Sequence, residues 1–348
     1  MADAPPLNTQ IIFASRDRKR AVEEAAKTIL AGDIAVLPTE TVYGLAANAL
    51  DGQAVQKVFA AKGRPQDNPL IVHIAEISML DDVARDIPQE SQALMEAFWP
   101  GPLSIVFKKN LNIPDVVSAG LDTVAVRMPH NQLMLDIIKK SGVPVAAPSA
   151  NRSGRPSPTT AQHAAEDLLG RVPLIIDGGS CSVGVESTVL DMTGDTPLIL
   201  RPGSITPGMI EKTIGKVDLH PAVLQGLRQG EQAQSPGMKY RHYAPNAAIF
   251  VFEGNKKTIA KNINARYDYY NEKSQNPVVF CAQECAPFYA GKETCVLGAS
   301  HDEIMCSLFA RLRQADDIGY GVILFHYTEE MGLAVKNRIL RAAEGAAK

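Results

Sequence analysis

The stretch Val143-Pro-Val-Ala-Ala-Pro-Ser149-Ala-Asn151 is an apolar run that stops at small polar residues. Two later stretches, Gly184-Val-Glu-Ser187-Thr188 and Leu198-Ile-Leu-Arg201-Pro-Gly203, also place polar groups beside apolar runs. Open α/β sheets bind their ligands where strands end. The sequence therefore predicts an α/β fold with a polar site assembled at the ends of its strands.

A fourth stretch, Lys62-Gly-Arg64-Pro-Gln-Asp-Asn68-Pro69, supplies positive charge directly before the apolar segment 70–74. In an extended chain, Lys62 and Arg64 would project to the same side. An exposed cation pair is usually a solvated surface, but the apolar strand that follows favours a functional role. Fixed cations, hydroxyls and glycine turns suit a site that holds a nucleoside triphosphate beside a small polar substrate.

Helix and strand patterns alternate through the first part of the chain. A helix over 22–30 is predicted as the first element, and apolar strands are predicted over 34–37 and 104–108. Thr159 and Gln162 form a capping box, which predicts a helix that begins after Thr159. So many strands with interspersed helices predict a large, mixed, twisted sheet.

Regular periodicity fades near residue 216 and returns near residue 247. We therefore predict a larger domain over 1–215, a linker over 216–246 and a smaller, Rossmann-like parallel α/β domain over 247–348. The linker contains Lys239-Tyr-Arg-His-Tyr243, a run too rich in rings and cations for a passive tether. We expect this segment to cross the active site.

Composition excludes several classes of protein. The chain has 348 residues and a net charge of -3, which excludes a generally basic nucleic-acid-binding protein. No apolar run approaches the about 20 residues of a membrane-spanning helix, and the first residues lack the features of a signal peptide. We expect a cytoplasmic protein that does not bind membranes.

The cysteines are expected to be reduced thiols. The five cysteines form no disulfide framework. Four of them lie close to one histidine in the sequence, but only Cys281 and Cys285 have the spacing of paired zinc ligands. We therefore expect buried thiols and no metal site at the cysteines near His301, which are Cys281, Cys285, Cys295 and Cys306.

Three further features have two interpretations each. The segment Thr39-Glu-Thr41-Val-Tyr43 is either a turn that satisfies its own backbone or a loop that binds a ligand. His73 lies inside an apolar strand, where a histidine is more often a satisfied core residue than a catalyst. Arg127 also lies in an apolar strand and needs an anion, for which a substrate carboxylate is one candidate. The sequence has no Walker loop and no nucleophile motif of a hydrolase.

Taken together, these motifs resemble the YrdC/YwlC-type threonylcarbamoyl-AMP synthases in their long two-domain form. The resemblance covers nearly the whole chain. The motifs that carry it are Thr39-Glu-Thr41-Val-Tyr43-Gly, Lys62-x-Arg64-Pro with Asn68-Pro-Leu, Phe98-Trp-Pro-Gly-Pro102, Val126-Arg127-Met-Pro129, Ala147-Pro-Ser149-Ala-Asn151, Ser187-Thr188, Arg201-Pro-Gly203, the segment from Ser235 to Pro245, and Asn337-Arg338.

The resemblance implies a YrdC-like catalytic domain and a nucleotidyltransferase reaction. L-threonine, bicarbonate or CO₂, and ATP would give threonylcarbamoyl-adenylate and pyrophosphate, the first step of N6-threonylcarbamoyladenosine formation in tRNA. The implied threonine-binding residues are Thr39, Thr41, His73, Arg127, Ala147 and Ser187. The implied ATP-binding residues are Lys62, Arg64, Asn68, Thr123, Ser149, Asn151, Ser157, Arg201 and Tyr243, of which Lys62, Arg64, Ser149 and Asn151 would be catalytic.

Charge explains why such a reaction would need these residues. The carbamate of threonine must attack the α-phosphorus of ATP while pyrophosphate leaves, so negative charges approach each other. Lys62, Arg64 and Arg201 would offset that repulsion, and Mg²⁺ carried by ATP would act on the leaving phosphates. A threonylcarbamoyl transferase of the same pathway is the expected partner. A weak contact with tRNA is a further expected interaction. Two alternatives stay open: a module that binds double-stranded RNA, and a hydrogenase-maturation carbamoyltransferase.

Overall fold

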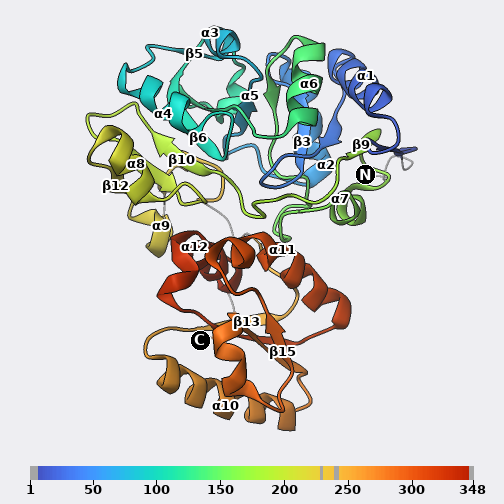
Figure 1. Ribbon diagram of the computed structural model, residues 1–348. Helices are drawn as coiled ribbons and strands as arrows, with labels where there is room; N and C mark the ends of the chain where they lie inside the picture. Colours follow the sequence, from blue (N-terminus) through green and yellow to red (C-terminus); the bar gives the residue numbers. More distant parts are fainter. Residues whose placement is uncertain (1–6, 228–229, 239–242, 345–348) are drawn as a thin grey trace. The chain divides into compact units, whose positions relative to one another are not determined.

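The computed structural model describes residues 7–227, 230–238 and 243–344. The chain divides into two compact units (Figure 1). Unit 1 comprises Met1–Ser153, Ser157–Ser182 and Glu186–Lys239, and unit 2 comprises Gly154–Pro156, Val183–Val185 and Tyr240–Lys348. Among the described helices, none combines the length and the apolar character needed to cross a bilayer.

Unit 1 is built on a 12-stranded mixed sheet, which confirms the predicted architecture. The strand order is β1-β9-β2-β3-β8-β4-β7-β6-β10-β11-β12, with β5 paired to β6. Its strands are β1 (Gln10–Phe13), β2 (Ala35–Leu37), β3 (Gly44–Asn48), β4 (Ile71–His73), β5 (Ala84–Arg85), β6 (Leu103–Lys109), β7 (Thr123–Arg127), β8 (Val145–Ala146), β9 (Leu174–Asp177), β10 (Thr188–Asp191), β11 (Leu198–Arg201) and β12 (Asp218–Leu219).

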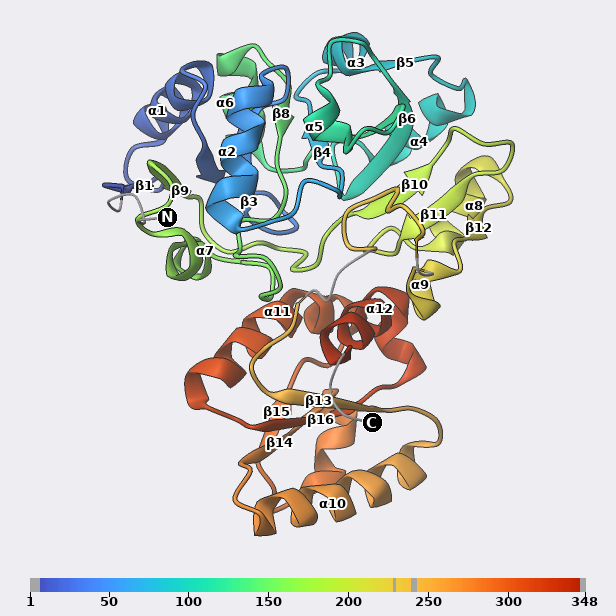
Figure 2. The same cartoon turned by 180° about the vertical axis from the view of Figure 1, so that it is seen from behind.

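Amphipathic helices cover this sheet. In α6, five apolar residues including Ile137 and Ile138 are buried, whereas the last turn carries two lysines and Gly142 caps the helix. Helices α1 and α6 lie side by side in both views (Figures 1 and 2). The helices of unit 1 are α1 (Arg18–Leu30), α2 (Gly52–Lys62), α3 (Leu80–Val83), α4 (Glu90–Phe98), α5 (Asp115–Ser118), α6 (Gln132–Ser141), α7 (Ala161–Leu168), α8 (Pro207–Ile214) and α9 (Ala222–Gln225), with a short 3-10 turn at Ile77–Met79.

Two local predictions were wrong. The first element is the strand β1, not a helix. This mostly exposed edge strand pairs in parallel with β9, and its sequence Gln-Ile-Ile-Phe is too short to show the alternating apolar pattern of a strand. The cap of α7 is Thr160, whose side chain accepts from the N–H of His163, whereas the capping box predicted Thr159. Adjacent threonines explain the one-residue error.

The central strands of unit 1 fix the position of the polar residues. Strand β4 runs parallel to β7, with His73 paired to Arg127 at their carboxyl ends. Strand β6 runs antiparallel to β7, and Ile105 pairs with Val126, so Ser104 lies beside Arg127 on the neighbouring strand. Strand β10 continues the sheet in parallel with β6. One end of the sheet thus gathers side chains from three separate segments.

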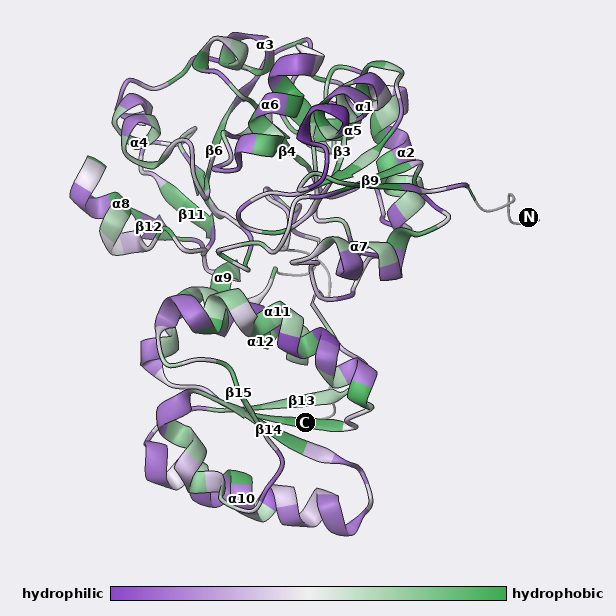
Figure 3. Cartoon of the chain, turned by 45° about the vertical axis from the view of Figure 1, so that its right-hand side comes forward, coloured by the Kyte–Doolittle hydropathy of each residue, from purple (hydrophilic) through white to green (hydrophobic). Residues whose placement is uncertain are grey.

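Unit 2 contains a four-stranded sheet in the order β13-β16-β14-β15, and every pair in it is parallel. Helix α10 packs on one face, and α11 and α12 lie on the other (Figure 1). Hydrophilic and hydrophobic positions alternate along α10 (Figure 3), whose buried residues include Ile259 and Ile263. The elements are β13 (Ala248–Phe252), α10 (Lys256–Glu272), β14 (Pro277–Cys281), β15 (Thr294–Val296), α11 (His301–Ile318), β16 (Val322–His326) and α12 (Gly332–Ala343), with 3-10 turns at Gln283–Tyr289 and Glu329–Met331.

Candidate active site

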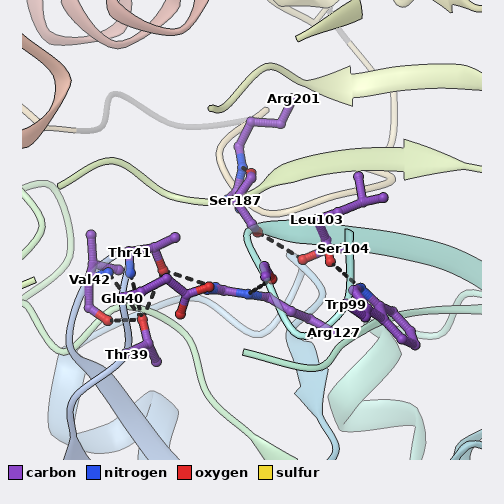
Figure 4. Close-up of polar contacts among 11 residues, drawn as sticks. Thr39, Glu40, Thr41, Val42, Trp99, Leu103, Ser104, Arg127, Ser187 and Arg201 are labelled. Atoms are coloured by element: carbon purple, nitrogen blue, oxygen red, sulfur yellow. Dashed lines mark hydrogen bonds and ion pairs between the residues drawn. The ribbon is translucent and has the colours of Figure 1, made fainter. Parts of the chain in front are cut away.

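Arg127 is the centre of the polar cluster in unit 1. It ends β7 with 3% of its surface exposed. Its Nε donates to the carbonyl of Gly101 (3.1 Å), and its Nη1 donates to Oγ1 of Thr41 (2.9 Å) (Figure 4). Its Nη2 lies 2.5 Å from Oε1 of Glu40, an ion pair buried on both sides. The guanidinium is therefore held from three directions at the end of the sheet.

A hydroxyl network shapes the loop that follows β2. The Oγ1 of Thr39 accepts from the backbone N–H groups of Thr41 (3.1 Å) and Val42 (3.2 Å), and it donates to the carbonyl of Val42 (2.6 Å). The hydroxyls of Thr39 and Thr41 are 2.8 Å apart. The turn interpretation of this loop is confirmed, because its threonines satisfy the backbone. The loop also places Thr41 against Arg127 (Figure 4), and its role in binding a ligand stays a prediction.

His73 lies next to Arg127 on β4 and is almost fully buried. Burial, and secondarily the positive charge of Arg127, lowers the pKa of His73 to about 3. The imidazole is therefore neutral at physiological pH. It can offer a hydrogen bond to a ligand, but it adds no charge to the site.

This depressed pKa predicts acid sensitivity. The unfolded chain binds a proton at His73 below about pH 6.5, and the folded chain does not until about pH 3, so stability is present above pH 6.5 and falls as the pH drops toward 3. The slope from this group approaches about 1.4 kcal/mol per pH unit. We expect His73→Gln to flatten the dependence of unfolding free energy on pH between 7 and 5, as measured by urea denaturation. The same substitution at the exposed His130 should leave the slope unchanged.

Ser187 and Arg201 form a second polar group beside Arg127. The hydroxyls of Ser187 and Ser104 are 2.8 Å apart. Arg201 donates to the carbonyl of Ser187 from Nε (3.1 Å) and Nη2 (3.0 Å), and from Nη2 to its hydroxyl (3.1 Å). Gly203 permits this approach, because a Cβ there would lie 2.4 Å from the backbone nitrogen of Thr188. The motifs Ser187-Thr188 and Arg201-Pro-Gly203 are therefore one structural piece.

The structure corrects the interpretation of the cation stretch. Lys62 and Arg64 do not share an extended strand: Lys62 ends α2, and Gly63 caps the helix in the left-handed conformation (φ 60). Lys62 is also buried, with its Nζ 2.5 Å from the carbonyls of Ser149 and of Asn151. Two cations two positions apart resemble a surface pair in sequence. Here the helix end turns one of them inward against the Ser149 segment.

The remaining predicted nucleotide residues occupy neighbouring segments. Arg64 donates to the carbonyls of Asn68 (3.2 Å) and Pro69 (3.3 Å). The Asn68 side chain is fully buried, and neither its nitrogen nor its oxygen has a hydrogen-bond partner within the described ranges. Ser149 donates to Oδ1 of Asn151 (2.5 Å). A buried amide without partners is costly, which is typical of a group positioned for a ligand.

Three predicted residues lie farther along these segments. Ala147 donates its N–H to the carbonyl of Ile71 (3.1 Å) and is therefore beside β4. Thr123 begins β7, whereas Arg127 ends it, so about 13 Å of strand separates the two. Ser157 is buried and hydrogen-bonds Oε1 of Glu186 (2.5 Å). The distance between Thr123 and Arg127 favours two neighbouring binding sites, one for the nucleotide and one for threonine, over a single one.

The linker is described only in part. Residues 239–242, which hold most of the predicted anchoring run, lie outside the described residues. The preceding segment contributes to unit 1: Nη1 of Arg201 donates to the carbonyl of Pro236 (3.3 Å), and Met238 packs in a cluster with Val189 and Leu200. Tyr243 belongs to unit 2, where its ring stacks on Phe309 at 5.0 Å. The assignment of Tyr243 to the nucleotide stays a prediction.

Sequence reasoning missed Glu40, Ser104, Glu186 and the carbonyl of Gly101. Glu40 stands between two threonines that were singled out, and the available signal was a lone carboxylate shortly after the apolar segment 34–37. Ser104 offered no signal, because its role comes from the pairing of β6 with β7 and β10. Nε1 of Trp99 donates to the carbonyl of Leu103 (2.7 Å), which ties down the turn that presents Gly101 to Arg127 (Figure 4).

The described residues contain no group of three or more histidine, cysteine or carboxylate side chains suited to hold a metal ion. Burial raises the pKa of the Cys281 thiol to about 12 and that of Cys295 to about 11. Both thiols are therefore protonated at neutral pH and poor nucleophiles.

The sequence of this chain is similar to that of known proteins over almost its whole length. Residues 27–203 match a family profile described as "Telomere recombination", and residues 205–344 match one described as "Threonylcarbamoyl-AMP synthase, C-terminal domain". The chain is 47% identical to a threonylcarbamoyl-AMP synthase of Pyrococcus abyssi, over 96% of this chain and 97% of the relative. It is 42% identical to one of Bacillus subtilis, over 93% of each.

A solved structure extends the likeness to the fold. The crystal structure of P. abyssi Sua5 complexed with L-threonine superposes with a TM-score of 0.88 at 44% sequence identity, and the match covers 96% of this chain and 98% of that one. The two family profiles match consecutive parts of the chain, and the relatives are matched over nearly their whole length. The chain belongs to the threonylcarbamoyl-AMP synthase family, in its two-domain form.

Proposed function

We propose that this protein synthesises L-threonylcarbamoyl-adenylate from L-threonine, bicarbonate or CO₂, and ATP, with release of pyrophosphate. The observation that carries the proposal is the buried Arg127, which has hydroxyls of Thr41 and Ser104 beside it at the end of the sheet. A fixed guanidinium suits a carboxylate, and neighbouring hydroxyls suit a small polar side chain. The relative from P. abyssi was solved with L-threonine.

The nucleotide would occupy the second group of residues. Lys62, Arg64 and Arg201 would offset the negative charge that builds up when the carbamate oxygen attacks the α-phosphorus and the bond to pyrophosphate breaks. We propose that Mg²⁺ enters on the ATP phosphates, since the described residues supply no metal-binding cluster. Metal on the leaving phosphates would lower the repulsion further.

The proposed setting follows from the product. A threonylcarbamoyl-adenylate is a reactive mixed anhydride, so a transferase that delivers its acyl group to tRNA must act next. We propose that this transfer takes place in the cytoplasm and that the linker covers the site during synthesis. Packing of Met238 and the contact of Pro236 with Arg201 support a role for the linker in unit 1.

Pyrophosphate release tests the proposal. ATP should yield pyrophosphate at a substantial rate only when threonine and bicarbonate are both present. Equal rates without threonine would contradict the proposal. Salt-dependent retention of tRNA with no threonine-dependent ATP consumption would favour an RNA-binding module instead.

Amino-acid specificity gives a sharper prediction. One methyl group distinguishes threonine from serine and is worth about 1–3 kcal/mol, so kcat/KM for serine should be about 10- to 200-fold lower. Valine replaces the hydroxyl with a methyl group and should be rejected more strongly, because buried hydroxyls such as those of Thr41 and Ser187 would lose a partner. The comparison requires kcat/KM for the three amino acids. Efficient use of valine would show that the hydroxyl is not recognised.

A further inference from the structure

The carboxylate of Glu40 is a buried charge with very few partners. The residue is 6% exposed. Its contact with Nη2 of Arg127 is close at 2.5 Å, but the atoms are not aligned as a hydrogen bond. Across the described residues, neither carboxylate oxygen accepts a hydrogen bond. Figure 4 shows the side chain directed toward Arg127 beside the hydroxyls of Thr39 and Thr41.

Such a carboxylate has spare accepting capacity. An ionised carboxylate has two oxygens and about four acceptor positions, and a single ion pair occupies few of them. Burying a charge without hydrogen bonds is costly. The fold tolerates this cost at Glu40 inside a cluster of candidate substrate-binding residues. A cationic donor from a ligand would satisfy the carboxylate.

Arg127 does not depend on Glu40 for its orientation. Its Nε is fixed by the carbonyl of Gly101 and its Nη1 by Oγ1 of Thr41, two acceptors on separate segments. Only Nη2 faces Glu40. The pair therefore consists of a cation held by the fold and an anion whose oxygens are largely unused.

We propose that Glu40 binds the α-ammonium group of the amino-acid substrate while Arg127 binds its α-carboxylate. This inference rests on the proposed function and deepens it. An amino acid is a zwitterion whose opposite charges are separated by one carbon atom, and the Arg127–Glu40 pair presents the complementary charges side by side. Binding exchanges one internal ion pair for two charge-assisted contacts and leaves the summed charge of Arg127, Glu40 and the zwitterion at zero.

The test compares two ligands on one isosteric variant. Glu40→Gln keeps the shape of the side chain and removes its charge. L-threonine carries both charges, whereas 3-hydroxybutanoate keeps the carboxylate and the hydroxyl but lacks the ammonium. We expect Glu40→Gln to weaken threonine binding about 10- to 100-fold, the range for a hydrogen bond to a charged group, and to change 3-hydroxybutanoate binding less than about 3-fold. Isothermal titration calorimetry measures both affinities.

A purely positioning role gives a different pattern. If Glu40 served only to orient Arg127, both ligands would weaken together in Glu40→Gln, because both present a carboxylate. That result would overturn the inference, and so would unchanged threonine binding. Glu76→Gln, which removes an exposed carboxylate ion-paired with Lys139, is the matched control and should affect neither ligand.

Two further measurements keep the test decisive. Glu40→Asp retains the charge, so it should still prefer threonine to 3-hydroxybutanoate even if Glu40→Gln folds poorly. The unmodified protein should itself bind threonine at least about 10-fold more tightly than 3-hydroxybutanoate. Equal affinity would overturn the inference without any variant. Failure of the unmodified protein to bind threonine at all would instead refute the proposed function.

Discussion

Replacing Lys62 with methionine is expected to lower threonine- and bicarbonate-dependent pyrophosphate release by about 100-fold or more. Methionine keeps the unbranched apolar stem and removes the ammonium. That ammonium is buried and joins the carbonyls of Ser149 and Asn151, so it is fixed before substrate arrives. A cation fixed in this way stabilises developing negative charge without reorganisation.

The burial of Lys62 also changes what is expected of stability. A surface lysine could be lost with little effect, but here two buried carbonyls would each lose a charged donor, at a cost of about 1–3 kcal/mol for an unsatisfied group. Thermal unfolding should therefore accompany the assay, at a temperature where the variant is folded. Lys57→Met, on the exposed side of the same helix, is the matched control and should retain activity. Near-normal activity of folded Lys62→Met would remove Lys62 from the site.

Replacing Arg201 with lysine is expected to cost about 100-fold in kcat/KM, although the charge is kept. Three nitrogens of Arg201 reach Ser187 and the linker carbonyl of Pro236 at once. A lysine has one nitrogen at the end of a flexible stem and cannot reproduce that planar arrangement. The variant should thus lose the order of the Ser187 segment and of the linker together.

Steady-state kinetics separate this effect from a general loss of fold. Arg18→Lys, at an exposed ion pair with Asp136, should behave like the unmodified protein. If Arg201→Lys kept both kcat and the KM values for ATP and threonine, the planar contacts would be irrelevant to the reaction and charge alone would suffice.

Most of the architecture was predictable because apolar periodicity is a local property. The mixed sheet of unit 1 and the parallel sheet of unit 2 both followed from strand and helix patterns. Strand β1 was missed because an exposed edge strand has no alternating pattern to detect. The pairing order of the strands was not predictable either, since β4 pairs with β7 and β8, and both of these strands lie far from β4 in the sequence.

The site was predictable as a set of residues and not as a geometry. Arg127 was identified because a guanidinium in an apolar strand demands a partner, but that partner, Glu40, was not. Lys62 was identified by its charge, but its environment was predicted wrongly, since the sequence could not show that it ends a helix and is buried. Ser104 became visible only when two other strands were paired beside it.

The hydroxyl pair after β2 can run in either direction. Thr39 and Thr41 share one hydrogen bond across 2.8 Å in which either oxygen can be the donor, and the oxygen of Thr41 also accepts from Arg127. When Thr41 donates to Thr39, its second lone pair is left to accept from a hydroxyl or ammonium of a ligand. When Thr41 accepts from Thr39, its own proton is left to donate to a carboxylate. Reversal of one hydroxyl pair therefore lets the same loop match either a donor or an acceptor.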